Sequence, residues 1–387
     1  MKPVAISEER LVPGDFVANI KADDLVYFCC NVGDADAQVV VLPASVDGVR
    51  RTIVIDAGVT DKITDLLAAL EHAGIITFAD PDHTTLALVV ATHPHHDHVA
   101  GMAQLLKTYG EHLGEFWEPG FFHTSASYTN MLREVAKLPS VVYSQPTSGL
   151  RRFFGPVALT VLSPSIHLRN RFDSYGVEIN DSSISMRFEH PARALFDKAS
   201  LGGQSNWATN PKSGTLILGA DAQTLSWSFV ATDFPFLSAS TTPQAKAIAA
   251  ATGSKDLLSA DVLKVSHHAS KHGVNLELIE RVRPAVTIVS STANGPSYGF
   301  PHTVTQNIIR EALDPVAGKL DATTGLPRDH ATDEKLGIFY TSDTTTKAGN
   351  PDAGSFALIM QGARRQLWRF GDSEGQAIDL TKGRQWS

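Results

Sequence analysis

The sequence predicts an α/β fold of four layers, an αββα sandwich in which two sheets pack face to face with helices outside. Strand-like and helix-like segments alternate along the chain, and each half ends in short strands. This alternation favours two packed sheets over one doubly wound sheet. We expect a single domain over residues 1–387 with two βα halves, roughly 20–195 and 214–370.

Apolar runs separated by turn residues define the strands of the first half. They are Leu25–Cys30, Gln38–Leu42, Thr52–Ile55, Leu86–Ala91, Ala158–Leu162 and Ser183–Phe188. Apolar residues at helical spacing predict helices at Lys62–Ala73, from Val99 to near Gly110, and at Arg133–Leu138. The rest of residues 115–155 is expected to be loop and short helix.

The second half repeats this pattern. Its predicted strands are Thr215–Leu218, Val262–Val265, Ala285–Ser290, Gly337–Tyr340, Ser355–Met360 and Gln366–Arg369. Its predicted helices are Pro243–Thr252, Asn275–Val282 and Thr303–Leu313. The polar, Gly/Asn-rich stretch 198–214 is expected to be a loop insertion. The irregular stretch 314–336 carries no functional signal.

Composition limits the class of protein. The 387 residues are 43% hydrophobic and 19% charged, as in an ordinary globular chain that can bury a large core. The net charge of −8 argues against nucleic-acid binding over the whole surface, although a local basic groove stays open as an alternative. No apolar stretch reaches membrane-span length and the N-terminus lacks a secretory pattern, so we expect no membrane partner and a cytoplasmic location. Cys29 and Cys30 are expected to be buried thiols, because neighbours in a strand point to opposite faces.

A run of histidine and aspartate, His93-Pro-His-His-Asp-His98, is the strongest functional signal. It joins a predicted buried strand to a predicted helix, at the carboxyl edge of a sheet, where open α/β folds place their sites. His93 and His95 are two apart and point the same way in an extended segment, so they can bind one ion. Asp97 and His98 begin the next helix and face differently, which suits a second ion. A surface patch that binds metal adventitiously is the alternative reading.

Two other strand ends carry residues of the same chemistry. The apolar run Leu216–Leu218 leads into Asp221, and Val262–Val265 leads into His267 and His268. Alone, Asp221 would be read as a turn residue, but three strand ends with Asp or His are jointly more specific. Imidazole and carboxylate ligands without thiolate suit two divalent ions, zinc first, with manganese or iron as alternatives.

These residues carry a family resemblance. His93-x-His95-x-Asp97-His98 resembles the HxHxDH signature of the metallo-β-lactamase superfamily, whose architecture is similar to the predicted sandwich. Further segments resemble the hydrolase domain of ComEC-type competence proteins and its soluble relatives, in the same order. They are Asn31–Ala37 (VGxGDA), Ile53–Gly58 (LIDxG), Ile217–Asp221 (TGD), Leu263–Lys271 (LKxxHHGSK) and Tyr298–His302 (YGHPH).

The resemblance implies a role for each ligand candidate. It implies His93 and His95 at one metal, Asp97 and His98 at the other, Asp221 bridging both, and His268 closing the second site. His267 would then face the substrate, although the two may be exchanged. Asp56 is implied as a carboxylate that orients the histidine turn, a role that metal-bound imidazole needs in any case.

The chain departs from the family pattern in three places. Ala269 replaces the glycine after the histidine pair, and Phe300 replaces the first histidine of the YGHPH loop. The usual third histidine of the first metal has no clear counterpart, and His167 and Asn180 are the two candidates. The other histidines, His83, His112, His123, His190 and His272, are assigned to loops or the surface.

The expected function is a binuclear metal hydrolase whose metal-bound hydroxide attacks phosphorus or a carbonyl carbon. Asp97 would bind metal and place the nucleophile, and His267 and His302 would stabilise the developing anion or protonate the leaving group. Lys271 is a candidate for a substrate phosphate, against the simpler reading of a solvated lysine. The ComEC-type resemblance favours a phosphodiester, either a small phosphoester or nucleic acid, of which the acidic chain does not favour the second.

Three alternatives stay open. One is hydrolysis of a lactone, thioester or β-lactam, because one fold hosts many reactions. Another is a metal-holding binding module without turnover. A third is a di-iron redox enzyme, which lacks a flavin-binding partner domain in this chain. The sequence does not indicate an oligomeric state.

Overall fold

A computed structural model describes most of the chain. The described residues are 12–79, 84–172, 177–192, 213–235, 256, 258–291, 298–314, 317, 319–320, 323–326, 328–342 and 353–386. The predicted helix Pro243–Thr252, His83 and nearly all of the predicted insertion 198–214 lie outside them.

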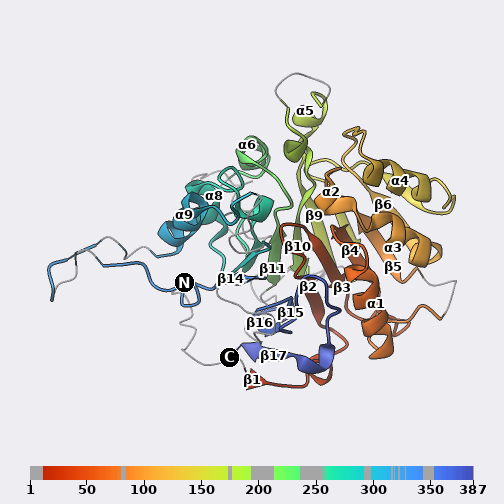
Figure 1. Cartoon of the computed structure of the whole chain (residues 1–387), viewed down its shortest axis with the longest axis horizontal. Helices are drawn as coiled ribbons and strands as arrows, with labels where there is room; N and C mark the ends of the chain where they lie inside the picture. The colour runs from red at the N-terminus through yellow and green to blue at the C-terminus, as the bar shows by residue number, and fades with distance from the viewer. Residues whose placement is uncertain are drawn as a thin grey trace, which may run out of the picture.

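The larger of two sheets combines strands from the beginning and the end of the chain (Figure 1). In spatial order its strands are β1 (Val12–Pro13), β17 (Arg384–Trp386), β16 (Arg364–Arg369), β15 (Phe356–Gln361), β2 (Leu25–Cys29), β3 (Ala37–Val41), β4 (Thr52–Ala57), β5 (Leu86–Val90), β6 (Leu113–Trp117) and β7 (Val142–Ser144). Strands β4 to β7 are mutually parallel, so their carboxyl ends share one edge.

The smaller sheet comes from the middle of the chain. In spatial order its strands are β14 (Ile338–Tyr340), β13 (Val286–Val289), β12 (Val262–Lys264), β11 (Gly214–Leu218), β10 (Ser185–His190), β9 (Val157–Ser163) and β8 (Arg151–Phe154). Strands β11 to β14 are parallel and again share a carboxyl edge. β4, β5, β11 and β12 all run into predicted site residues at these edges.

Helices cover the outer faces of both sheets. On the larger sheet they are α1 (Lys62–His72), α2 (His96–Val99), α3 (Met102–Tyr109) and α4 (Ala126–Val135), and on the smaller one α6 (Thr224–Asp233), α8 (Leu276–Val282) and α9 (Thr303–Leu313) (Figure 1). The short α5 is Ile166–Arg169, and the single 3₁₀ turns are η1 (Val17–Asn19), η2 (Gly110–His112), η3 (Ile179–Ser182), η7 (Ser266–Ala269) and η8 (Leu380–Lys382).

Three apolar clusters confirm the predicted αββα order of layers. One lies between the larger sheet and its helices and another between the smaller sheet and its helices. The central cluster joins the facing sides of the two sheets, with Tyr27, Ile55 and Trp117 from one and Phe188 and Leu218 from the other, all fully or almost fully buried. The burial of apolar side chains between the sheets therefore holds the two carboxyl edges together.

Residues 115–155 correct the prediction of loop and short helix. The segment contains the end of β6, then β7 and β8, and its helix α4 begins at Ala126 rather than near Arg133. β7 and β8 are edge strands with largely exposed side chains, so they lack the apolar run by which a buried strand is recognised. Helix α6 was not predicted, because only Ser226, Trp227 and Val230 of its residues are buried.

Two further expectations concern the cysteines and the membrane. Cys29 and Cys30 are free and buried, as expected, and burial raises the pKa of the Cys29 thiol to about 12. Among the described residues, no helix combines the length and the apolar character that crossing a bilayer requires.

Candidate metal centre

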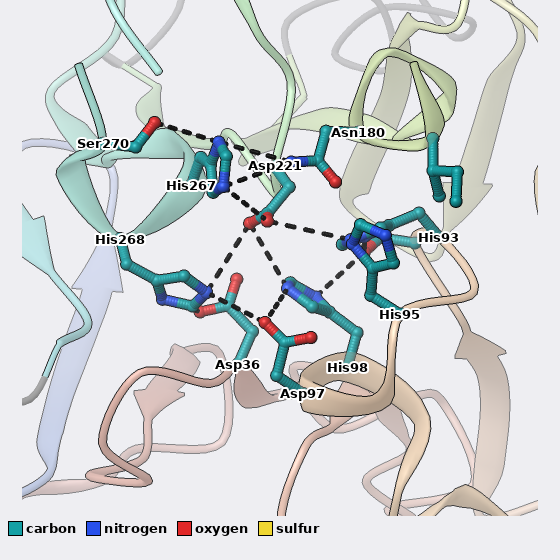
Figure 2. A network of polar contacts seen from close by, with 12 residues as sticks. Asp36, His93, His95, Asp97, His98, Asn180, Asp221, His267, His268 and Ser270 are labelled. Carbon is teal, nitrogen blue, oxygen red and sulfur yellow. Dashed lines mark hydrogen bonds and ion pairs between the residues drawn. The ribbon is translucent and has the colours of Figure 1, made fainter. Parts of the chain in front are cut away.

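The ligand candidates converge where the carboxyl edges of the two sheets meet. The turn after β5 brings His93, His95, Asp97 and His98, the turn after β11 brings Asp221, and η7 after β12 brings the histidine pair (Figure 2). Asp221 lies at the centre of the group, with imidazole rings on both sides. Segments that are far apart in the sequence thus form one polar cluster because parallel strands end at the same edge.

The histidine turn packs tightly against the backbone that follows β4. His95 is extended (φ −68°, ψ 151°), and α2 begins directly after it, so His93 and His95 precede the helix while Asp97 and His98 belong to it. Gly58 follows β4, and a Cβ there would lie 1.9 Å from the Asp97 carbonyl oxygen. Only glycine permits this close approach of the two backbones.

One ligand set is compact. Asp97, His98, Asp221 and His268 each offer an atom, and these atoms all lie within 4.8 Å of one another. His98 Nε2 lies 3.3 Å from Asp221 Oδ1, and His268 Nε2 lies 3.7 Å from the same oxygen. His268 Nε2 is also 3.6 Å from Asp97 Oδ2. We call this group the second set.

Hydrogen bonds fix which ring nitrogens of the second set face the centre. His98 Nδ1 bonds Asp56 Oδ2 at 2.7 Å, and His268 Nδ1 donates to the Ser290 carbonyl at 2.9 Å. The Nε2 atoms of both rings and Asp221 Oδ1 are buried without a hydrogen-bond partner among the described residues. Buried polar atoms are rarely left unpaired. Converging orphan nitrogens and oxygens therefore fit a divalent cation.

The other ligand set is looser. His93 Nε2 lies 3.2 Å from His95 Nδ1 and 3.7 Å from Asp221 Oδ2. Asn180 Nδ2 lies 3.1 Å from His267 Nε2, which in turn lies 3.7 Å from Asp221 Oδ2. The Asn180 side-chain oxygen is buried, and no described residue forms a hydrogen bond with it. We call His93, His95 and Asp221 the first set, with Asn180 and His267 at its border.

The histidine pair lies in unusual backbone. His267, His268 and Ala269 all have positive φ, of 50°, 50° and 60°. This left-handed region is disfavoured for residues with a side chain, and such strain persists where packing determines the conformation. Ala269 stands where the family has glycine, and it occupies that conformation here. The Phe300 ring packs on the pair, 5.6 Å from His267 and 5.9 Å from His268 between centroids.

The electrostatics differ between the two sets. Burial lowers the pKa of His93, His95 and His267, which keeps these imidazoles neutral. Burial acts the same way on His98 and His268, but the surrounding carboxylates, Asp221 first among them, together outweigh it and raise the pKa of both. In the metal-free chain the second set is therefore a cluster of imidazoles ion-paired with carboxylates. A cation that binds there must displace protons from these rings.

Not every predicted residue joins this cluster. His302 caps α9, where its Nδ1 accepts from the Val304 N–H at 3.2 Å. Lys271 is exposed beyond η7. The exposed His167 lies on α5, and its ring packs on Phe229 at 5.5 Å between centroids. Of the two candidates for the third ligand of the first metal, the structure brings Asn180 to the cluster and places His167 against Phe229.

Of the remaining histidines, His190 differs from its assignment to a loop or the surface, and His123 has an unexpected neighbour. His190 is buried in β10 and its Nε2 bonds the Asp23 carbonyl at 2.8 Å. His123 lies in the loop after β6 as expected, but its ring is 6.1 Å from that of His95 between centroids. His123 therefore borders the first set, a position that only the parallel pairing of β5 with β6 reveals.

Asp36 belongs to the segment that resembles VGxGDA, for which the resemblance implies no role. Its carboxylate forms a fully buried ion pair with Lys264 and lies in a second buried group with Asp56 and His98. Burial disfavours the charged Lys264, but Asp36 and Asp221 outweigh it and raise the pKa of the lysine. The sequence offered one signal for this pair, a lysine within the apolar run Val262–Val265.

Known proteins resemble this chain in part. Residues 44–150, which include the histidine turn, match the model of the metallo-beta-lactamase superfamily. The two packed sheets and their helical layers form a metallo-β-lactamase-like αββα sandwich, in agreement with this match. No curated protein matches the chain.

Three solved structures are similar to it. The metallo-beta-lactamase fold protein YhfI from Bacillus subtilis is 14% identical, with a TM-score of 0.39, and the match covers 87% of this chain and 100% of YhfI. A mutant of the β-hydroxylase CmlA, an enzyme of Streptomyces venezuelae, is 12% identical, with a TM-score of 0.36 and coverage of 76% and 51%. Igni18, a metallo hydrolase from Ignicoccus hospitalis, is 13% identical, with a TM-score of 0.34 and coverage of 74% and 91%.

Proposed function

We propose that this chain is a binuclear metal-dependent hydrolase that acts on a phosphodiester. The observation that carries the proposal is the position of Asp221 between two ligand sets. Its Oδ1 lies 3.3 Å from His98 Nε2, and its Oδ2 lies 3.7 Å from His93 Nε2. A carboxylate that offers one oxygen to each side suits a bridging ligand of two ions a few ångströms apart.

The ligand chemistry favours zinc, with manganese or iron as alternatives. His93 and His95 would hold the first ion, and Asp97, His98 and His268 the second. Two such ions supply Lewis acidity and lower the pKa of bound water toward neutrality. The site assignment, the metal and the treatment of residues 1–387 as one cytoplasmic domain are all part of this proposal.

Asn180 is the proposed third protein ligand of the first ion. Its amide nitrogen donates to His267 Nε2 at 3.1 Å, which occupies the lone pair of that ring nitrogen. His267 Nδ1 then donates to Ser270 Oγ at 2.9 Å. Among the described residues the buried Asn180 oxygen has no hydrogen-bond partner and is available to a cation, so His267 acts as a substrate-facing residue and not as a ligand.

The residues at the open side supply the remaining chemistry. The side chain of Asp97 is 38% exposed, whereas those of His98 and Asp221 are almost fully buried. Asp97 is therefore placed to orient a nucleophile and accept its proton. His267, whose side chain is 17% exposed, is the proposed group that stabilises charge developing on the substrate. His302 and Lys271 are more distant candidates for the leaving group and for a substrate phosphate.

Resemblance to ComEC-type proteins supports a phosphodiester substrate, since the five matching segments span residues from about 31 to 302. The net charge of −8 favours a small phosphoester over duplex nucleic acid, whose binding usually takes several Lys or Arg contacts. A carbonyl-directed hydrolase of the same site is the second candidate. A binding module without turnover is the third, supported by the looser first set.

One experiment separates these candidates. Protein of measured metal content is assayed on bis(p-nitrophenyl) phosphate, a phosphocholine ester, a lactone and a β-lactam, beside folded His95→Ala and Asp221→Ala variants. We expect turnover of a phosphodiester that both variants abolish. Turnover of the lactone or β-lactam alone would favour the carbonyl-directed hydrolase over the phosphodiesterase. Failure on all four by metal-replete protein would favour the binding module, and full activity in either variant would refute the site.

A further inference from the structure

A buried ion pair crosses between the two sheets directly behind the second set. Lys264 is the last residue of β12 in the smaller sheet, and Asp36 precedes β3 in the larger sheet. Both side chains are 0% exposed. Two buried charges are costly to desolvate, and well-packed apolar residues often replace such a pair without loss of stability. Fold stability is therefore a weak explanation for placing this pair here.

Asp36 is bonded to the backbone that presents ligands from the larger sheet. Its N–H donates to the Asp97 carbonyl at 3.1 Å, and its own carbonyl accepts from the Gly58 N–H at 2.8 Å. Its carboxylate lies close enough to Asp56 and His98 to form one buried group with them. The position of Asp36 and the position of the turn at Asp97 are thus fixed together.

The same short segment is bonded to the ligand from the smaller sheet. Ser290 Oγ donates to the Ala35 carbonyl at 2.8 Å, and the Ser290 carbonyl accepts from His268 Nδ1 at 2.9 Å. Asp36 Oδ1 lies 3.9 Å from that same His268 nitrogen. Residues 35–36 therefore contact both the His98 side and the His268 side of the second set.

We propose that Asp36 and Lys264 are a positioning pair that fixes the spacing between the turn at Asp97 and the turn at His268. The inference rests on the ligand sets of the proposed function but not on the reaction. The second set takes ligands from both sheets, whereas the histidines of the first set belong to one turn. Loss of the pair should thus weaken cation binding at the second set much more than at the first.

The test uses a charge-neutral double variant, Asp36→Asn with Lys264→Met, which avoids leaving one buried charge unpaired. A matched control exists in the pair Lys62–Asp372, whose side chains are 2% and 4% exposed and lie 2.7 Å apart. Lys62 belongs to α1 and also bonds the Ser373 carbonyl, so this pair anchors the C-terminal segment. The control is Lys62→Met with Asp372→Asn.

Zinc affinity of each set is measured by competition with a chromophoric chelator. A His95→Ala background isolates the second set, and a His268→Ala background isolates the first. In the first background we expect the Asp36/Lys264 double variant to bind zinc at least about tenfold more weakly, and in the second within about threefold of the parent. The control double variant should change neither affinity by more than about threefold. Thermal unfolding of the metal-free forms tests whether both double variants are folded.

Three results would overturn the proposal: unchanged affinity of the second set, equal losses at both sets, or the same loss in the control. If the double variant does not fold, Ser290→Ala provides the test, because it removes the bond to the Ala35 carbonyl without touching a charge. Ser290→Ala should lower the zinc affinity of the second set and not that of the first. If the affinity of the second set is not selectively lowered, the proposal is overturned. A parent protein that binds no zinc contradicts the proposed function itself, which is a distinct outcome.

Discussion

Asp56 Oδ2 lies 2.7 Å from His98 Nδ1, and this bond turns the Nε2 of the same ring toward Asp221. Asp56 has a φ of 59°, and its carboxylate also accepts from the Thr92 N–H at 2.8 Å and from the Thr92 hydroxyl at 2.7 Å. A carboxylate in this role orients a metal-binding imidazole and raises its basicity.

We therefore predict that Asp56→Asn weakens zinc binding by about 10- to 100-fold. An amide presents a donor where Thr92 and His98 both need an acceptor, so the ring of His98 loses its fixed orientation. Competition with a chromophoric chelator measures the affinity. Asp24→Asn is the control, because Asp24 is equally buried but pairs with Arg364. Equal losses of affinity in the two variants would contradict the role of Asp56.

The histidine pair gives a second prediction, because the two rings have different partners. His268 Nε2 is buried and has no hydrogen-bond partner in the described part of the chain, whereas His267 Nε2 accepts from Asn180. His268→Ala should remove one bound ion per chain, and His267→Ala should keep both ions but lower kcat by about 10²- to 10³-fold. Metal content by mass spectrometry and steady-state kinetics check this. Loss of an ion in His267→Ala, with retention in His268→Ala, would exchange the two roles.

Local sequence signals were enough to select the residues at the centre of this cluster, but not those around it. The apolar run that became β5 and the histidine turn were recognisable because both signals are local. The choice of Asn180 over His167 as third ligand of the first ion could not be made from local sequence. It depends on where η3 meets η7 in space. The Asp36–Lys264 contact joins residues 228 positions apart and follows only from packing of the two sheets.

Asn180 provides the third prediction. Its buried side-chain oxygen has no partner within the described ranges and borders the first set, while the exposed His167 packs on Phe229. Asn180→Ala should lower the affinity for the first ion by about tenfold, as expected for removal of a group that orients or binds a metal. His167→Ala should leave both ions in place. Isothermal titration of metal-free protein with zinc distinguishes binding of the first ion from binding of the second. An effect of His167→Ala alone would make His167, and not Asn180, the third ligand.

The fourth prediction concerns pH. In the metal-free chain burial opposes charge on His98 and His268, but the surrounding carboxylates, Asp221 first among them, together outweigh it and raise the pKa of both rings. A group whose folded pKa is raised stabilises the fold fully below its unfolded pKa, about 6.5 for histidine, and loses that contribution as pH rises through the folded pKa. Metal binding needs both rings deprotonated, so stabilisation by zinc grows with pH.

Thermal unfolding of metal-free and zinc-loaded protein between about pH 6 and 8.5 measures both effects. We expect the Tm of the metal-free form to fall as pH rises, and the difference in Tm between the two forms to widen. The pKa of Asp221 is lowered, mainly by His98 and His268 acting against burial, so its own contribution is lost only in acid, below this window. His98→Gln should flatten the decline of the metal-free form. A difference in Tm that stays constant or narrows as pH rises would show that zinc does not displace protons from these two rings when it binds.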